Sequence, residues 1–439
     1  MLFQINSFIR GEKMRKSFFV LLVFLSVIFF FSGCDNKVVK EKIIIREEKI
    51  ISSAIKVSDN EFVIAGYSTE DVDEKIKNKG LTDFWIAEIN KNGEFISQNL
   101  FGSYEYDKAR VIKRTTDGGY VVAGFSVDDI LILKLNHSCE LEWKKTIGGS
   151  SIDDAYDIIQ TSDEGFILVG ASKSNDGDLE DNLGAFDYLV VKLNKNGKLE
   201  WVRNFGGSID DFARSVVELE DGYLIVGYTY SGDWDITNRI GEADIWVIKI
   251  DKDGNLIWER SYGGKYDDKA YSIIKANDSG FIISGITRSS YENLNKKKVI
   301  GEQDIYILKI DKNGNVIWDK TFGKPGTDGF SAITLDKNGY IVSGYRFKVD
   351  KIVETETIEP DDGPIFYGHD IIWIFRIDNE GNLVNETFFD EGQDARVPVV
   401  IPTTDDNGYL IFENIYETGM FHYFIIKLSD DFIEEWRKK

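Results

Sequence analysis

Short apolar runs, separated at regular intervals by Gly, Asp and Asn, fill the chain after residue 48. In one stretch the runs are Tyr156–Gln160, Phe166–Gly170, Tyr188–Leu193 and Leu199–Phe205. Each run is rich in Val, Ile, Leu, Tyr or Phe and ends at turn-forming residues, which is typical of strands. None has the length or the period of an amphipathic helix. The pattern therefore predicts groups of four antiparallel strands, here lettered A to D in chain order.

One motif recurs along the chain and groups these runs. It reads T-x-D-x-G-aromatic, then an Asp that opens a run ending in Lys, then a turn with Gly, a Trp and a Gly-Gly pair. Its seven copies are centred on Glu88, Lys134, Lys192, Lys249, Lys309, Arg376 and Lys427. The spacing of roughly 46 to 67 residues lies around the period of propeller blades. The sequence predicts an all-β fold, a seven-bladed β-propeller of four-stranded antiparallel blades, over residues 49–439.

Several positions repeat from copy to copy, and we expect most of them to be structural. We expect the glycines that end strand B to mark close approaches of neighbouring sheets, and the Trp of strand D to pack between blades. The Asp before strand A either caps its turn or meets a basic residue of the next blade. The Lys near the end of strand C is either an outer-face charge or the partner of that Asp.

Ring closure requires the first and last blades to join. Phe432–Lys438 is predicted to be the last strand D. The β-prone segment Lys42–Glu47 is expected to take part in closure, pairing beside that strand or replacing it.

The N-terminus predicts a secretory lipoprotein signal. Arg15 and Lys16 precede the apolar stretch Phe18–Phe31, which is followed by Ser32, Gly33 and Cys34. A basic region, a short apolar region and a small-residue site form a signal peptide, and the segment ending at Cys34 resembles the bacterial lipobox. That resemblance implies cleavage before Cys34 and lipidation, such as palmitate, on this residue.

These features predict three segments. Residues 1–33 form the signal peptide, of which 1–13 are an incorrect upstream extension if Met14 is the true start. Residues 34–48 form the lipidated cysteine and a tether, and residues 49–439 form the propeller. The expected location is the cell envelope, on the extracytoplasmic side of a bacterial membrane to which the lipid anchors the chain.

The charge of the chain narrows the classes of partner. The formal net charge is −23, and it becomes −26 without residues 1–33, which carry four basic and one acidic side chain. Such an excess of carboxylates excludes nucleic acid as an expected partner. It allows cation binding, and Ca²⁺ is the one cofactor that the sequence suggests.

The long B–C loops and the D–A turns emerge on one face, which we expect to be acidic and to hold the site. Candidate cation ligands on two B–C loops are Asp176, Asp178, Asp181, Asp233 and Asp235. Ca²⁺ favours clustered oxygen ligands of this kind. The spacing matches no calcium motif, so the alternative is that these side chains bond to the loop backbone as Asx turns.

Aromatic residues on the same face are candidate ligand contacts. They are Trp234, Phe366 and Tyr367, the last two in the longest predicted loop, Phe347–His369. A solvated flap is the alternative interpretation of that loop. The carboxylates of the D–A turns are expected on this face as well.

No catalytic residues are identified in the sequence. The three histidines, His137, His369 and His422, have no paired spacing, and no nucleophile or phosphate-binding motif appears. The repeats resemble those of uncharacterised bacterial secreted and lipoprotein β-propeller proteins over Ile51–Trp436. They are also loosely similar to pyrroloquinoline-quinone-type propeller repeats in the step Asp251–Trp258. The first resemblance implies the fold and no established activity.

Two classes of function remain open at this point. The favoured one is a non-enzymatic binding or scaffolding module for an envelope protein or a glycan. The alternative is an envelope enzyme, either a carboxylate-dependent glycan hydrolase or a quinone-dependent oxidoreductase. An enzyme should break the repeat symmetry with convergent polar residues near the channel mouth, and a scaffold should show varied loops without them.

Overall fold

The computed structural model describes residues 49–179, 181–289, 302–324, 326–353, 365–390, 395–403, 408–417, 420–432 and 434–438. The chain divides into two units, 1–44 and 45–439, and the described residues all belong to the second. The predicted signal peptide, Cys34 and the tether lie outside the described residues. No helix in the described part of the chain is long and apolar enough to cross a membrane.

Seven four-stranded antiparallel sheets form the blades, and each is built from one continuous stretch of chain. Blade 1 holds β1 (Lys49–Ser58), β2 (Glu61–Ser68), β3 (Asp83–Asn90) and β4 (Phe95–Phe101). Blade 2 holds β5 (Asp107–Arg114), β6 (Tyr120–Ser126), β7 (Asp129–Leu135) and β8 (Leu141–Ile147). Blade 3 holds β9 (Asp153–Gln160), β10 (Phe166–Ser172), β11 (Asp187–Leu193) and β12 (Leu199–Phe205).

The remaining four blades repeat this order. Blade 4 holds β13 (Asp211–Leu219), β14 (Gly222–Thr229), β15 (Asp244–Ile250) and β16 (Leu256–Tyr262). Blade 5 holds β17 (Asp268–Lys275), β18 (Phe281–Thr287), β19 (Asp304–Ile310) and β20 (Val316–Phe322). Blade 6 holds β21 (Asp328–Asp336), β22 (Gly339–Val353), β23 (Ile365–Ile377) and β24 (Leu383–Phe389). Blade 7 holds β25 (Ala395–Pro402), β26 (Tyr409–Glu417), β27 (Met420–Leu428) and β28 (Glu434–Lys438).

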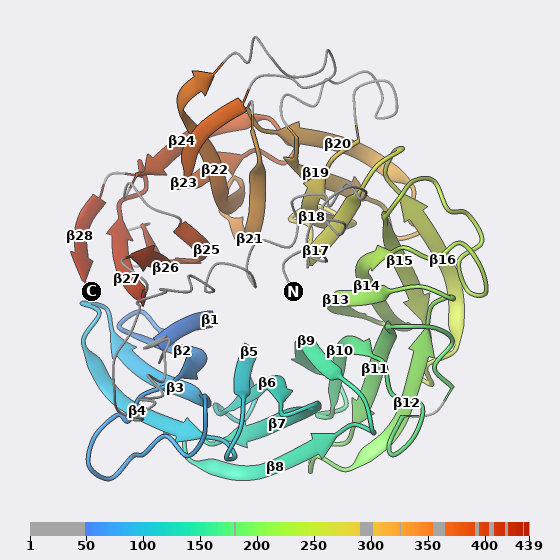
Figure 1. Cartoon of the computed structure of the whole chain (residues 1–439), viewed down its shortest axis with the longest axis horizontal. Helices are drawn as coiled ribbons and strands as arrows, with labels where there is room; N and C mark the ends of the chain where they lie inside the picture. Colours follow the sequence, from blue (N-terminus) through green and yellow to red (C-terminus); the bar gives the residue numbers. More distant parts are fainter. Residues whose placement is uncertain are drawn as a thin grey trace, which may run out of the picture. The chain divides into compact units, whose positions relative to one another are not determined.

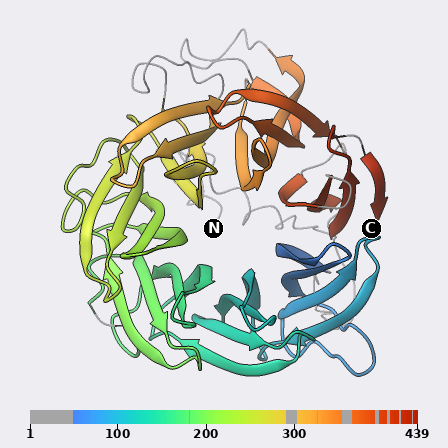
Figure 2. The same ribbon diagram turned by 180° about the vertical axis from the view of Figure 1, so that it is seen from behind.

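The blades follow one another around a ring, with the first strand of each blade on the inside and the fourth on the outside (Figures 1 and 2). The predicted seven-bladed propeller is confirmed, and no helix occurs among the residues that the structure describes. The four strands predicted in blade 3 are confirmed too, except that strand A begins three residues earlier, at Asp153.

Side chains join the first and last blades, and each of these blades keeps its own four strands. The Asn414 amide on β26 accepts a hydrogen bond from the Ile51 N–H at 3.0 Å and donates one to the Ile51 carbonyl at 2.8 Å. Trp85 packs on Tyr423 with ring centroids 5.6 Å apart. β28 occupies the outermost position of blade 7, so Lys42–Glu47 does not replace it, and its pairing beside β28 lies outside the described residues.

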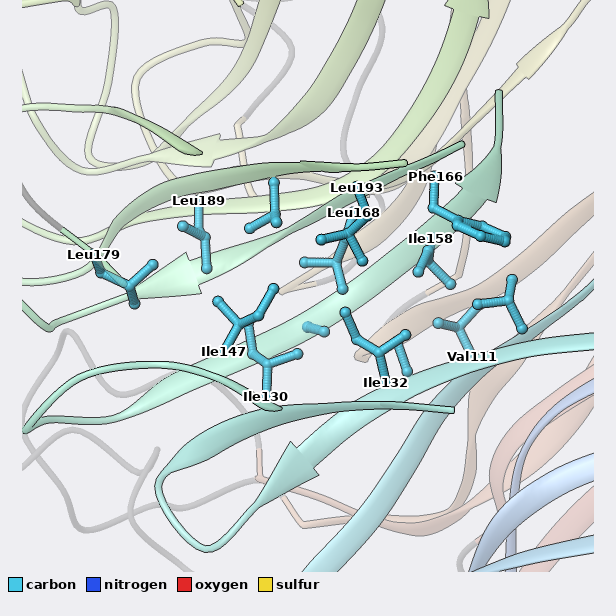
Figure 3. Packing of buried hydrophobic residues seen from close by; sticks show 14 residues of the cluster. Val111, Ile130, Ile132, Ile147, Ile158, Phe166, Leu168, Leu179, Leu189 and Leu193 are labelled. Carbon is cyan, nitrogen blue, oxygen red and sulfur yellow. The ribbon is translucent and has the colours of Figure 1, made fainter. Parts of the chain in front are cut away.

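Apolar layers between adjacent blades form the core, because each sheet buries both of its faces. Between blades 2 and 3, Ile130, Ile132 and Ile147 face Ile158, Leu168 and Leu189 (Figure 3). The repeated Trp covers the outer rim of these layers. Trp143 of blade 2 lies 5.7 Å from the Phe166 ring of blade 3, and a Cβ on Gly197 would lie 2.8 Å from it. The predicted packing of this Trp between blades is therefore confirmed for blades 2 and 3.

Candidate ligand-binding site at the channel mouth

A β-bulge interrupts the innermost strand of every blade at the same repeat position. The register shifts fall between Ile51 and Ser53 in blade 1, Ala109 and Val111 in blade 2, and Ala213 and Ser215 in blade 4. Blades 3, 5 and 6 have the same shift, and blade 7 has a wider irregularity between Arg396 and Val399. A bulge inserts an unpaired residue, bends the strand and re-aims a side chain, and bulges are frequent next to functional sites.

The glycine that ends strand B makes room for this bulge. A Cβ on Gly227 would lie 1.9 Å from the carbonyl oxygen of Phe212, on the bulged strand of the same blade. Gly124 and Gly285 have the same relation to the carbonyls of Lys108 and Lys269, at 2.1 and 1.8 Å. The closest approach therefore comes from strand A within the blade, not from a neighbouring sheet as the sequence suggested. No side chain larger than hydrogen fits there.

The bulged residues line a cavity of about 570 Å³ at the centre of the ring. In blades 1 to 6 they are Ser52, Arg110, Tyr156, Arg214, Tyr271 and Ser331, and all six belong to the lining. Tyr67, Ile286, Gln303 and Tyr345 are among the other lining residues. The volume lies within the usual range of small-molecule sites. The side chains differ from blade to blade although the backbone repeats, so the site is asymmetric.

The two arginines of the cavity have different environments. Arg110 forms an ion pair with Asp154, with 2.8 Å between Nη2 and Oδ2. Arg214 lies against aromatic rings instead: its guanidinium carbon is 4.0 Å from the Tyr156 centroid and 5.1 Å from that of Tyr271. Cation–π contacts hold a guanidinium in place without neutralising it. Among the described residues, the lining includes these two arginines and no carboxylate.

Three tyrosines at the site stay neutral over the physiological range. Burial raises the pKa of Tyr156 to about 12, and burial also raises the pKa values of Tyr228 and Tyr271. Their hydroxyl groups therefore remain hydrogen-bond donors. The Ser331 hydroxyl oxygen is buried and has no hydrogen-bond partner within the described structure. The cavity thus combines flat rings, neutral donors and cationic groups.

The Asp before strand A is buried and does not add charge to the face. Asp107, Asp211 and Asp268 have no exposed surface. One oxygen of each accepts a hydrogen bond from the N–H of Ser103, Gly207 or Gly264, at 2.6 to 2.8 Å. The capping alternative is therefore confirmed for these three residues. The D–A turns consequently contribute less negative charge to the ligand face than the sequence suggested.

These buried carboxyls meet a second set, the Asp that opens strand C. A Cβ on Gly206 would lie 2.5 Å from Asp187 Oδ1 and 2.6 Å from Asp211 Oδ2, so both carboxyls converge on one glycine. Burial, together with the nearby Asp211 carboxylate, raises the pKa of Asp187 to about 7. Burial raises the pKa of Asp211 to about 6. A proton retained on such a pair offsets the repulsion between the two groups.

The Lys near the end of strand C has a different partner from the one expected. Lys192 Nζ lies 2.9 Å from Asp163 on the A–B turn and 3.2 Å from Glu200, and its side chain is 3 % exposed. Lys134 and Lys309 repeat the pairing with their own A–B turns. This Lys is therefore neither an outer-face charge nor the partner of the Asp before strand A.

The predicted cation ligands bond to backbone where their partners are described. Asp176 accepts a hydrogen bond from the Ser150 N–H at 2.7 Å. The equivalent contact one blade further on joins the Ser208 N–H to Asp233 at 2.8 Å. Asp235 accepts from the Gly206 N–H at 3.1 Å. These contacts reach the backbone of D–A turns and not that of the loop itself, so they differ from the Asx turns of the alternative. Asp178 and Asp181 are exposed, and no group of three His, Cys, Asp or Glu fit for a metal occurs in the described residues. Calcium binding by these loops stays a prediction.

The predicted aromatic contacts lie on two segments of the B–C face, and only Trp234 has a described side chain. Trp234 lies on a B–C loop with 69 % of its surface exposed. Phe366 and Tyr367 lie on β23, where they pair with Ile352 and Lys351 of β22. The segment predicted as the longest loop is therefore in large part an extended hairpin, and residues 354–364 lie outside the described structure. A ligand role for these three aromatics stays a prediction.

A second hollow lies among the turns of blades 3 and 4, and several of its charges are already paired. Its volume is about 770 Å³, and its lining includes Lys192, Glu218 and Lys252. Lys252 lies 2.5 Å from Glu218, and Lys192 is held by Asp163 and Glu200. These internal ion pairs leave few groups for a ligand, so the channel mouth is the stronger candidate.

The channel residues are the functional candidates that the sequence interpretation missed. Strand A opens with D-x-A and then a residue that changes from copy to copy, namely Arg110, Tyr156, Arg214 and Tyr271. A variable polar or aromatic position within a conserved frame of an inner strand was the available signal. It was not recognised because a register shift has no mark in the apolar pattern.

Comparisons with known proteins find only distant structural likenesses, which indicate no function. No family model matches the chain, and no curated protein matches it. A mutant apocarotenoid oxygenase from Synechocystis is 12 % identical with a TM-score of 0.43, covering 88 % of this chain and 91 % of that one. A putative 6-phosphogluconolactonase from Bacteroides uniformis is 10 % identical with a TM-score of 0.43, covering 77 % and 88 %. Drosophila Plexin A, in a complex with Semaphorin 1b, is 9 % identical with a TM-score of 0.44, covering 84 % and 86 %.

Proposed function

We propose that this chain is a lipid-anchored binding protein of the bacterial cell envelope that takes a ligand at the channel mouth. The observation that carries the proposal is the ring of bulged strands, which aims six side chains of three types, Ser, Arg and Tyr, into one cavity of about 570 Å³. A packing role alone would favour one residue in most blades, as at the repeated Trp. Variation at the aimed position supports a ligand with an asymmetric shape.

Binding explains the lining better than glycan hydrolysis does. Convergent polar residues at the mouth are the feature that we expected of an enzyme. However, hydrolysis by a carboxylate pair needs two carboxyl groups about 5 to 10 Å apart around the reacting bond, and the lining holds arginine, tyrosine and serine. A convergent site with this chemistry suits recognition of a ligand more than attack on it.

Filling the cavity from the side opposite the arginines tests the proposal. We expect Ser331→Trp to abolish binding of envelope glycans to the purified protein, because the indole would occupy the space near Phe330 and Tyr345. Ser97→Trp is the matched control, since Ser97 lies on outer strand β4 where other blades carry Trp. Glycan-array binding measures both variants, and thermal unfolding confirms that each is folded. If Ser331→Trp still binds glycans, the binding site does not lie in the channel and the proposal is wrong.

The anchor has a separate test. We expect the full chain to partition with membranes and to incorporate labelled palmitate, and Cys34→Ala to release the protein or leave an unprocessed precursor. Cys139→Ala is the control, because Cys139 is the only other cysteine of the chain. A wild-type protein that is soluble without detergent and carries no label would contradict the lipid anchor.

A further inference from the structure

The charge and the rings of the cavity point to one class of ligand. We propose that the channel mouth binds an acidic saccharide, with its carboxylate on Arg214 and a sugar ring on the neighbouring tyrosines. This inference rests on the proposed function and deepens it by naming the chemistry of the ligand.

Arg214 is the group that selects for an anion. Its guanidinium is half-buried and lies against Tyr156 and Tyr271, with the Tyr228 centroid 5.9 Å away. The carboxylate that acts on it electrostatically, Asp154, is bonded to Arg110 at 2.8 Å. No hydrogen bond or ion pair joins Arg214 to another described residue. It therefore presents its donors to the cavity.

The planar fork of a guanidinium matches the two oxygens of a carboxylate, and such paired hydrogen bonds are stronger than neutral ones. Partial burial strengthens the attraction, because the effective dielectric constant is lower than in water. The chain as a whole carries a net charge of −23, so it repels anions at long range. Binding of an anion therefore depends on this local site.

The rest of the lining indicates a sugar as the body of the ligand. Tyr67, Tyr156, Tyr271 and Tyr345 place four rings around the cavity, and Ser52, Gln303 and Ser331 add neutral polar groups. Flat rings pack against the apolar faces of sugars, and hydroxyl and amide groups bond to sugar hydroxyls. A phosphorylated ligand is less well matched, because Arg110 is already paired and Arg214 alone would meet the greater charge of the phosphate.

Calorimetric titration of the mature protein with three trisaccharides tests the inference. The probes are trigalacturonate, its methyl ester and neutral trigalactose. We expect trigalacturonate to bind at least tenfold more tightly than either neutral probe. Arg214→Gln should remove that preference, a loss that a single charge-assisted pair can account for. Arg260→Gln is the matched control, because Arg260 also lies over an aromatic ring, 5.8 Å from the Trp258 centroid, but on outer strand β16.

The outcomes separate this inference from the proposed function. Equal affinity for the acid and the ester, or an unchanged preference in Arg214→Gln, would overturn the acidic ligand. If neutral probes then bind and Ser331→Trp abolishes that binding, the channel site still stands. Binding of trigalacturonate that persists in Ser331→Trp would overturn both. If trigalacturonate does not bind to the wild type, the inference of an acidic saccharide is wrong. The glycan-array comparison of the wild type with Ser331→Trp tests the channel site independently.

Discussion

Gly227→Ala is expected to lower the free energy of unfolding by at least about 3 to 4 kcal/mol, near the upper end for single substitutions. The added Cβ would lie 1.9 Å from the Phe212 carbonyl oxygen and 2.7 Å from the Tyr188 hydroxyl oxygen. The backbone carbonyl belongs to the bulge that aims Arg214, so neither strand can move without losing the bulge. Denaturant unfolding followed by tryptophan fluorescence measures the loss.

Gly118→Ala is the control for this prediction. Gly118 lies on the A–B turn of blade 2 with a φ of +85°, and a Cβ there would meet nothing within 4 Å. Gly118→Ala should lower the free energy of unfolding only by the cost of placing alanine in the left-handed conformation, about 1 to 2 kcal/mol. If both substitutions cost the same, the close approach at the bulge is not the reason for the repeated glycine.

The second large effect is a dependence of stability on pH. The wild-type protein should be more stable at pH 5 than at pH 8, by on the order of 2 kcal/mol or more. The cause is the set of buried carboxyls whose pKa values burial raises: to about 7 for Asp187 and Asp328, and to about 6 for Asp211 and Asp268. Denaturant midpoints across this range measure the effect.

The direction follows from proton binding. Between pH 4 and 7 the folded chain holds protons that the unfolded chain releases, since the ordinary pKa of Asp is about 3.9. The stabilisation is complete below that value and is lost as the pH rises through 6 and 7. Asp117 and Asp163, whose pKa values are lowered to about 2 by hydrogen bonds that outweigh burial, act oppositely and only below about pH 4. Asp117 and Asp163 therefore do not change the dependence of stability on pH between pH 5 and 8.

Asp187→Asn isolates the contribution of one pair. The amide is close in shape to the protonated acid and cannot ionise, so this variant should lose less stability than the wild type between pH 5 and 8. Asp253→Asn, at an exposed turn of blade 4, should keep the wild-type slope. A wild-type protein whose stability rises from pH 5 to 8 would contradict the assignment of raised pKa values.

The repeated positions of the chain made the fold predictable from sequence. Trp143 and its equivalents, the turn glycines and the four apolar runs per copy mark contacts that recur in most blades. The ion-pair partner of the Lys on strand C was predicted less accurately. Lys192 pairs with Asp163 of its own blade, because the pairing of strands B and C places the A–B turn beside this Lys. That proximity depends on register, which the apolar pattern alone does not give.

The candidate site was harder to predict for a related reason. The sequence indicated Asp176 and Asp233 as candidate cation ligands. In the structure these two residues make equivalent hydrogen bonds to the D–A turns of adjacent blades, so they stabilise a repeated turn. Arg110 and Arg214 looked like ordinary strand residues because a bulge reverses the alternation of inward and outward positions. In this ring the candidate site is indicated by the position that varies between repeats, the bulged residue of strand A, and not by the positions that recur.

A crystal structure of the mature protein with the trisaccharide that binds most tightly in solution tests the central claim most directly. The account predicts density for the ligand between Tyr156, Arg214 and Tyr271, inside the ring of bulged strands. Density at the exposed B–C loops around Trp234, with the channel mouth filled by solvent alone, would contradict it.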